Sequence, residues 1–122
     1  MGSTPRIGKT SFGRITVAGV KYDHDIIIRL DGTVKKRKKK LSKAVYGTSH
    51  RVSLSEMEYV YEDGAECLVI GTGQTGLVEL SEEAADYLRQ KGCQVRLAPT
   101  PAAAELWNKT KGSVIGLFHT TC

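Results

Sequence analysis

Residues 71–76 read Gly-Thr-Gly-Gln-Thr-Gly and are the part of the sequence best suited to holding a ligand. Glycines at this spacing let the backbone turn sharply and approach a bound group closely. The preceding run, Cys67-Leu68-Val69-Ile70, is apolar and stops at a glycine, as a buried strand does. We therefore predict a glycine loop at the carboxyl end of a strand, where open α/β sheets bind their ligands.

The loop fits the Gly-x-Gly-x-x-Gly pattern of dinucleotide-binding proteins, but its surroundings do not. In that motif the third glycine opens a helix, whereas residues 77–80 read as a short extended segment before Ser81. About twenty residues further on, where an acidic ribose ligand is expected, the sequence offers Arg96 instead. We predict no cofactor. Two interpretations stay open, a tight turn or a pocket lined by backbone amides.

Side chains from other segments should meet the loop at the same edge of the sheet. Thr100 follows the next predicted strand, and His119 ends the last one. The hydroxyls of Thr72, Thr75 and Thr100, together with the glycine amides, are rich in donors and suit a small anion or a partner's carboxylate. His119 would add a group that titrates near physiological pH. The alternative is that these threonines cap helices and satisfy turns.

The histidines and cysteines form no recognisable metal or nucleophile motif. His119 and Cys122 are three residues apart, which would point them to opposite faces of a strand, and two ligands make no site. We therefore predict no metal site. Cys67 and Cys93 lie in apolar runs and indicate a reducing compartment, and Cys122 is the cysteine that we expect to be accessible.

The run from Lys35 to Lys40 is entirely basic. Together with Lys43 it carries seven positive charges, and removing these from the net charge of +5 leaves −2, so the basicity is local. Such a run could contact phosphate backbones, but no aromatic residues interleave with it to stack on bases. We favour the alternative, a solvent-exposed sheet edge whose charges prevent strand pairing.

The remaining sequence supplies the elements that position these groups. Residues 12–22 and 25–30 predict antiparallel strands, with a hairpin turn at Asp31-Gly32. From residue 53 onward helices and strands alternate, which predicts parallel pairing. We expect helices to begin near Ser53, Ser81 and Thr100 and strands to span 67–70, 93–98 and 114–118.

These elements predict an α/β fold in which N-terminal antiparallel β-hairpins join a βαβαβ-like parallel part, a mixed sheet with helices packed on it. We expect one domain over residues 1–122, with residues 1–10 as a loose lead-in. Residues 41–50 have weak periodicity and receive no assignment. Apolar and charged fractions of 40% and 25% are ordinary for a soluble protein. The sequence holds no apolar stretch of membrane-spanning length, so we expect a cytoplasmic protein.

Several motifs together resemble a known family. They are Leu68 to Gly73, Tyr87-Leu88, Gly92, Val95-Arg96, Thr100, Ala103-Ala104, Asn108 and the C-terminal Gly116 to Cys122. The chain resembles, over nearly its whole length, the small domains that include the adipogenesis-associated Mth-domain protein and mitochondrial complex I assembly factor three. The resemblance implies a compact mixed α/β domain with a pocket and no established enzymatic activity. This chain departs from the family where its lysine run replaces a tryptophan-containing segment, and its one tryptophan is Trp107.

We expect a non-catalytic binding or assembly module that uses the glycine-loop pocket for a protein partner or a small anionic ligand. An enzyme or an anion-binding domain that uses the loop with His119 is the alternative, and nucleic-acid association through the lysine run is a weaker one. The candidate ligand-binding residues are Gly71, Thr72, Gly73, Gln74, Thr75, Gly76, Thr100, Asn108 and His119.

Overall fold

Successive side chains of a strand point to opposite faces of its sheet, and this alternation builds the layers of the computed structural model, which describes residues 4–122. In β7 (Cys67–Thr72), Leu68 and Ile70 join one apolar cluster while Cys67 and Val69 join the other. Every residue of β7 is buried, so this strand has packing partners on both faces. The central sheet is therefore covered on both sides.

The central sheet has five strands in the order β5-β4-β10-β7-β9. Strands β10, β7 and β9 are parallel, whereas β4 pairs antiparallel with both β10 and β5. The bounds of the other four strands are β4 Ile26–Ile28, β5 Val34–Lys36, β9 Gln94–Ala98 and β10 Val114–His119.

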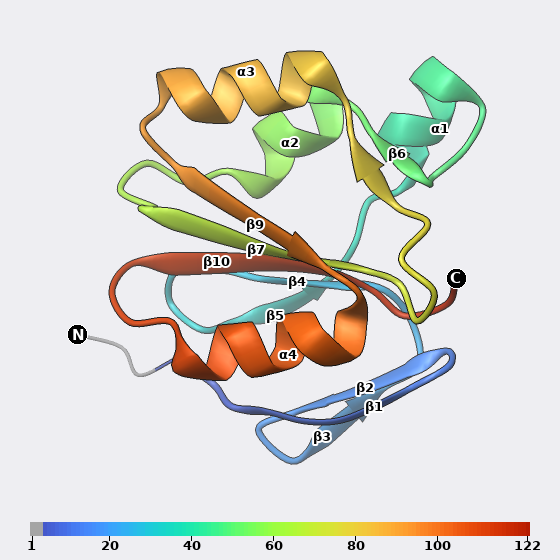
Figure 1. The fold of residues 1–122 in the computed structure, drawn as a ribbon, viewed down its shortest axis with the longest axis vertical. Helices are drawn as coiled ribbons and strands as arrows, with labels where there is room; N and C mark the ends of the chain where they lie inside the picture. The colour runs from blue at the N-terminus through green and yellow to red at the C-terminus, as the bar shows by residue number, and fades with distance from the viewer. Residues whose placement is uncertain (1–3) are drawn as a thin grey trace.

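Helices α2 and α3 cover one face of this sheet and α4 covers the other (Figure 1). Ser53 and Ser81 cap α2 and α3 by accepting the amides of Glu56 and Ala84. The short helix α1 lies beside α2, and its last residue is followed by Gly47 in the left-handed conformation (φ 72°). The helices span α1 Lys40–Tyr46, α2 Leu54–Val60, α3 Glu82–Gln90 and α4 Thr100–Lys109.

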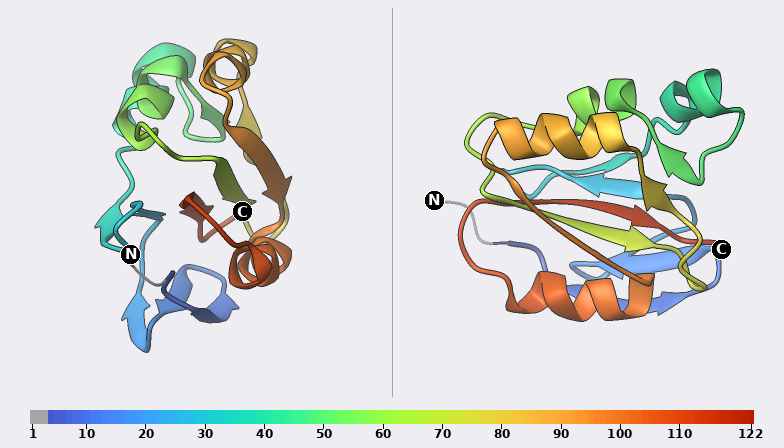
Figure 2. Two further views of the ribbon diagram at one scale, coloured as in Figure 1. Left: turned by 90° about the vertical axis from the view of Figure 1, so that its left-hand side faces the viewer. Right: turned by 45° about the horizontal axis from the view of Figure 1, so that its top comes forward.

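Two smaller sheets complete the fold (Figures 1 and 2). An antiparallel sheet of three strands packs beside α4, where Trp107 and Phe118 meet edge to face at 5.9 Å. A parallel pair, β6 and β8, joins the loop before α2 to the segment before α3. The strands are β1 Ile7–Ser11, β2 Arg14–Val17, β3 Val20–Tyr22, β6 Arg51–Val52 and β8 Glu79–Leu80.

The predicted fold class is confirmed, with antiparallel hairpins leading into a parallel β7-α3-β9-α4-β10 unit. The prediction of a loose lead-in is wrong for residues 7–10, because they belong to β1. Ile7 in this strand is buried under α4. The unassigned segment 41–50 contains most of α1. Thr100 is the first residue of α4 rather than its cap, which leaves its hydroxyl free for other bonds.

Candidate functional site

A buried network of charged side chains lies beside the end of β10. Arg37 is 4% exposed, and its Nε and Nη2 donate to the two carboxylate oxygens of Glu56 at 2.7 and 3.1 Å. Its Nη1 donates to Asp25 at 3.0 Å, and Nη2 also donates to the carbonyl oxygen of Ser49 at 2.8 Å. Arg37 was predicted to be exposed with the rest of the lysine run, and this prediction is wrong. Arginine suits the buried position because its planar fork can serve several acceptors at once.

His119 extends this network toward the C-terminus. Its Nδ1 lies 2.6 Å from a carboxylate oxygen of Asp25, and the other oxygen accepts the amide of Thr120 at 2.8 Å. Burial alone would raise the pKa of Asp25, but the hydrogen bonds from His119 and Thr120 and the charge of Arg37 hold it below its ordinary value. The carboxylate is therefore charged, and it fixes the ring of His119 in place.

The glycine loop is closed by the protein's own chain. The amide of Gly73 donates to the Thr100 hydroxyl at 2.9 Å, and that of Gln74 donates to the carbonyl oxygen of Thr121 at 2.6 Å. The amide of Gly76 turns back onto the carbonyl oxygen of Gly73, at 3.2 Å. The prediction of bare amides open to an anion is wrong at these three positions, because Thr100, the C-terminal segment and the loop's own carbonyl group accept their hydrogen bonds.

The glycines of this segment serve close packing. A Cβ on Gly71 would lie 2.8 Å from the Phe118 ring and 2.8 Å from the Thr100 hydroxyl. One on Gly73, which has φ 105°, would meet the carbonyl group of Cys122. Gly71 also belongs to β7 and not to a loop. The spacing that resembles a phosphate-binding loop therefore reflects how tightly β7, β10 and the C-terminal segment approach one another.

The predicted meeting of Thr100 and His119 with the loop is confirmed. The Thr100 hydroxyl donates to the carbonyl oxygen of His119 at 2.6 Å while it accepts the amide of Gly73, so it joins α4 to both β10 and β7. Asn108 lies elsewhere, near the end of α4. Its side-chain amide bonds both the N–H and the carbonyl oxygen of Ile7, at 2.9 and 2.8 Å, and so attaches β1.

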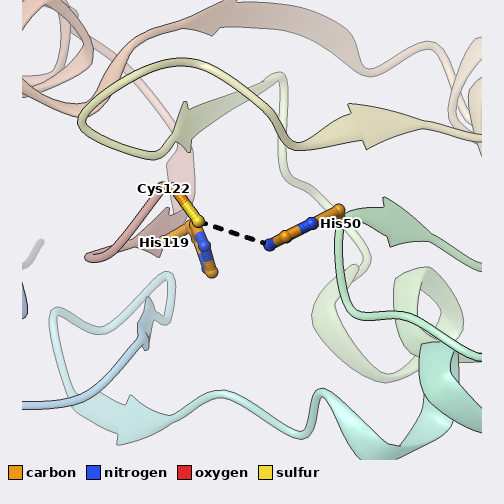
Figure 3. Close-up of side chains that lie close together, drawn as sticks. All are labelled: His50, His119 and Cys122. Carbon is orange, nitrogen blue, oxygen red and sulfur yellow. Dashed lines mark hydrogen bonds between the residues drawn. The ribbon is translucent and has the colours of Figure 1, made fainter.

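A second group of side chains surrounds the free side of His119. His50, which precedes β6, and Cys122 approach it, and every pair of their donor atoms lies within 4.8 Å (Figure 3). The Sγ of Cys122 is 3.8 Å from Nε2 of His50, and the two imidazole rings meet edge to face at 5.5 Å. The prediction that His119 and Cys122 face apart is wrong, because β10 ends at His119 and its alternation does not reach Cys122.

Strand β9 borders an open hollow of about 560 Å³ on the other side of the loop. Figures 1 and 2 show β9 at the outer edge of the sheet, with α3 and α4 on either side. Leu97 lines this hollow and is 45% exposed, and Leu77, between the lining residues Gly76 and Val78, is 56% exposed. Its lining residues come from the loop, β8, α3 and the end of β9, and are Thr72, Thr75, Gly76, Val78, Glu79, Leu80, Ala85, Leu97, Ala98 and Pro99.

Comparison with known proteins identifies the family. A family model described as a protein of unknown function (DUF498/DUF598) matches residues 7–117. The chain belongs to the DUF498/DUF598 family. A conserved hypothetical protein from Pyrococcus horikoshii shares its structure with a TM-score of 0.90 and 30% sequence identity, over 96% of this chain and 99% of that one.

Two further structures support this placement. A protein named MT938 is 29% identical over 98% of this chain and its own entire length, with a TM-score of 0.84. A Mth938-like domain from Bordetella pertussis has the same fold at 19% identity, with a TM-score of 0.60 over 95% of this chain and 85% of that one. The resemblance to the Mth-domain family is therefore confirmed. Within residues 4–122, no helix is long and apolar enough to cross a membrane.

Sequence reasoning found His119 but missed the partners that surround it. Arg37 carried a usable signal, because an arginine inside a run of lysines suits a multiply bonded position. Ser53 and Glu56 have the spacing of a capping box, and the structure uses half of that motif: Ser53 caps the helix while the Glu56 carboxylate turns inward to Arg37. His50 comes from a loop, and nothing in its spacing connects it with residues about seventy positions away.

Proposed function

We propose that this protein is a non-catalytic binding module that receives an extended segment of a partner protein along the free edge of β9. The observation that carries the proposal is the combination of an unpaired strand edge with an apolar hollow at one end and basic side chains at the other. The strand edge offers main-chain hydrogen bonds, the hollow offers apolar contact, and the basic side chains offer charge complementarity.

The backbone edge supplies the main-chain contacts. β9 pairs with β7 and is the last strand of its sheet. The amide of Gln94 donates inward to the carbonyl oxygen of Glu66, so the alternating amides of Val95 and Leu97 point outward. An added strand would bond to these outward groups, which is how extended peptides join sheets in several recognition domains.

The hollow supplies an apolar anchor at the carboxyl end of β9. Leu97 is exposed there, and Pro99, Val78 and Leu80 line the same space. Leu77, between the lining residues Gly76 and Val78, is exposed as well. A leucine-sized side chain buried against such a surface contributes about 1.5–3 kcal/mol. A partner segment should therefore carry an aliphatic residue at this end.

Basic side chains near the start of β9 determine the charge expected at the other end of the partner segment. A smaller hollow of about 390 Å³ near the start of β9 is bordered by Arg96, Lys109 and Lys111, with Glu66 as its one acidic residue. Three positive groups against one negative group favour an acidic partner residue. The partner is thus an extended protein segment that is acidic at one end and aliphatic at the other.

The glycine loop supports this interpretation better than an anion pocket. The amides of Gly73, Gln74 and Gly76 are occupied, but Thr72, Thr75 and Gly76 line the hollow beside β9. The loop then acts as one wall of the surface. The Thr75 hydroxyl donates to the carbonyl oxygen of Cys122 at 3.2 Å, and its oxygen can still accept a hydrogen bond from the partner. Two of the three threonines predicted from the sequence, Thr72 and Thr75, therefore keep a role as lining residues of the proposed binding surface.

Two short synthetic peptides test the proposal, one for each strand direction, with glutamates placed against Arg96 and leucines and valines placed against Leu97. Amide shifts of the isotopically labelled protein would be followed by NMR during titration. We expect shifts at 94–98 and at Leu77 and none at β5, the opposite edge strand. Peptides with lysine in place of glutamate should bind several-fold more weakly.

Matched variants make the test specific to the surface. Leu97→Glu places a charge in the hollow and should abolish the shifts, whereas Val45→Glu changes another exposed apolar residue, on α1, and should leave them intact. Equal binding by the two variants, or shifts distributed over β5, would show that β9 is not the binding edge.

A further inference from the structure

Three potential metal ligands converge at the end of β10, apart from the edge of β9. His119 ends β10, Cys122 follows it, and His50 comes from the loop before β6. Their donor atoms all lie within 4.8 Å of one another, and Cys122 Sγ lies 3.8 Å from His50 Nε2. Zinc with nitrogen ligands at about 2.0–2.1 Å and sulfur at about 2.3 Å holds neighbouring donors about 3.3–3.7 Å apart. Small side-chain rotations would bring the set into this range.

The neighbours of His119 leave one ring nitrogen with only a hydroxyl as its partner, which a cation can displace. The carboxylate of Asp25 can only accept, so Nδ1 at 2.6 Å carries the proton. Nε2 then has its lone pair directed toward the cluster, where the Thr121 hydroxyl lies 3.1 Å away. A histidine held by a carboxylate on its far nitrogen is the common arrangement behind metal-binding imidazoles, because the carboxylate fixes the tautomer and raises the basicity of the ligand.

The backbone holds the other two residues in position. The carbonyl oxygen of His50 accepts the amide of Glu79 at 2.8 Å, and its own amide donates to the Thr48 hydroxyl at 3.1 Å. The carbonyl oxygen of Cys122 accepts the amide of Leu77 at 3.0 Å. Binding of a cation therefore requires rotation of side chains, with little movement of the chain, which lowers the entropic cost of closing the site.

Charge and ligand type identify the class of ion. Two imidazoles and a thiolate form a borderline-soft set that suits Zn²⁺ and disfavours Mg²⁺ or Ca²⁺. With Cys122 as a thiolate, the negative groups of the cluster and of its network (Cys122, Asp25 and Glu56) exceed the one charge of Arg37 by two. A divalent cation would neutralise this excess.

We propose that His50, His119 and Cys122 form a three-ligand site for a borderline-soft divalent cation, of which Zn²⁺ fits best. His119 is buried, while His50 and Cys122 are half-buried, so the fourth coordination position opens toward solvent. Three protein ligands with one open position is the arrangement of zinc sites that exchange a water molecule or a partner's ligand.

Cobalt provides the direct test, because Co²⁺ occupies zinc sites and reports its ligands by absorption. The full chain, stripped with a chelator and kept reduced, would be titrated with Co²⁺ and then with Zn²⁺. We expect one ion per chain, the intense visible bands of a tetrahedral centre, a sulfur-to-cobalt charge-transfer band, and displacement of cobalt by Zn²⁺.

Variants assign the ligands. Cys122→Ser should remove the charge-transfer band, and both Cys122→Ser and His50→Gln should weaken Zn²⁺ binding at least tenfold. His24→Gln changes a half-buried histidine outside the cluster and should bind Zn²⁺ as the wild type does. Far-ultraviolet circular dichroism would establish that each variant is folded.

A second measurement needs no variant. Zn²⁺ should protect Cys122 from alkylation by iodoacetamide, followed by mass spectrometry, while Mg²⁺ should not. The proposal is overturned if Co²⁺ gives the weak spectrum of an octahedral aqua ion, if Cys122→Ser and His50→Gln bind Zn²⁺ as tightly as His24→Gln does, or if Zn²⁺ leaves the alkylation rate unchanged.

Discussion

At the scale of single residues, Arg37 shows how position decides the role of a charge. Five lysines surround it in the sequence and all are exposed, yet its guanidinium is buried between Asp25 and Glu56. Removal of one member of a buried ion pair leaves the others charged and without a partner, which is far more costly than the loss of a surface charge. The same run of basic residues therefore contains a structural centre and a solvated surface.

Arg37→Gln should lower the free energy of unfolding by about 3–5 kcal/mol, because Glu56 and Asp25 would remain buried without their counter-charge. Lys35→Gln, two positions earlier on the exposed side of β5, should change it by less than about 0.5 kcal/mol. Urea denaturation at neutral pH measures both. Similar stabilities for the two variants would mean that the network does not stabilise the fold.

Gly73 is a second residue whose role can be isolated. Gly73→Ala adds a methyl group against the carbonyl of Cys122 in a backbone with φ 105°, whereas Gly92→Ala also has positive φ (71°) but meets nothing within 4 Å. The backbone strain alone costs about 1–2 kcal/mol. We expect Gly73→Ala to lose clearly more stability than Gly92→Ala in thermal or urea unfolding, and an equal loss would show that the C-terminal segment does not pack against the loop.

At the scale of elements, Thr100 joins the beginning of α4 to the ends of two strands. Thr100→Val keeps the shape of the side chain but removes the hydroxyl that bonds the Gly73 amide and the His119 carbonyl oxygen. Each buried polar group left unsatisfied costs about 1–3 kcal/mol of stability. Thr100→Ser keeps the hydroxyl and should retain most of the stability. Hydrogen exchange of the Gly73 amide is the local measurement: it should accelerate in Thr100→Val and stay slow in Thr100→Ser.

The elements themselves were largely predictable, and the reasons are local. Ser53 and Ser81 cap their helices by accepting hydrogen bonds from amides three residues later in the chain. The apolar run after Glu66 is stable only when it is buried in the core, as β7 is. Residues 7–10 were missed because Ile7 is one apolar residue whose burial depends on α4, about a hundred positions later. Helix α1 was missed because it buries little, with Ser42 as its buried residue.

The candidate site was less predictable for the same physical reason. The meeting of Thr100, His119 and the loop follows from parallel strand topology, and the prediction succeeded. Occupation of the loop amides by Thr121 and Thr100 depends on where the last residues turn after β10, which no periodicity encodes. The approach of His50 likewise depends on the β6–β8 pairing, a contact of two residues in each strand.

At the scale of the whole molecule, the two edges of the central sheet differ in character. β5 carries Lys35 and Lys36 and leads into the remaining lysines, whereas β9 exposes Leu97 beside an apolar hollow. A series of like charges along an edge resists strand pairing, whereas β9 has a single charged residue, Arg96. This asymmetry directs an incoming strand to β9 and leaves β5 solvated.

Nucleic-acid binding by the lysine run should be weak, independent of sequence and sensitive to salt, because it would rest on phosphate contacts alone. Fluorescence anisotropy with labelled single-stranded DNA of two unrelated sequences would measure it at low and physiological ionic strength. Replacement of Lys35, Lys36, Lys38 and Lys39 by glutamine should abolish the binding with little effect on stability. Sequence-specific binding that persists at high salt would contradict this expectation.

The measurement that tests the central claim most directly compares Leu97→Pro with Leu97→Ala in the titration with the acidic–aliphatic peptides. Both variants remove the leucine side chain, but proline also removes the amide that points away from β7, and the bonds between β9 and β7 stay intact in either case. We predict that Leu97→Ala binds more weakly than the wild type and that Leu97→Pro loses binding altogether at similar stability. Equal affinity of the two variants would contradict strand addition at β9.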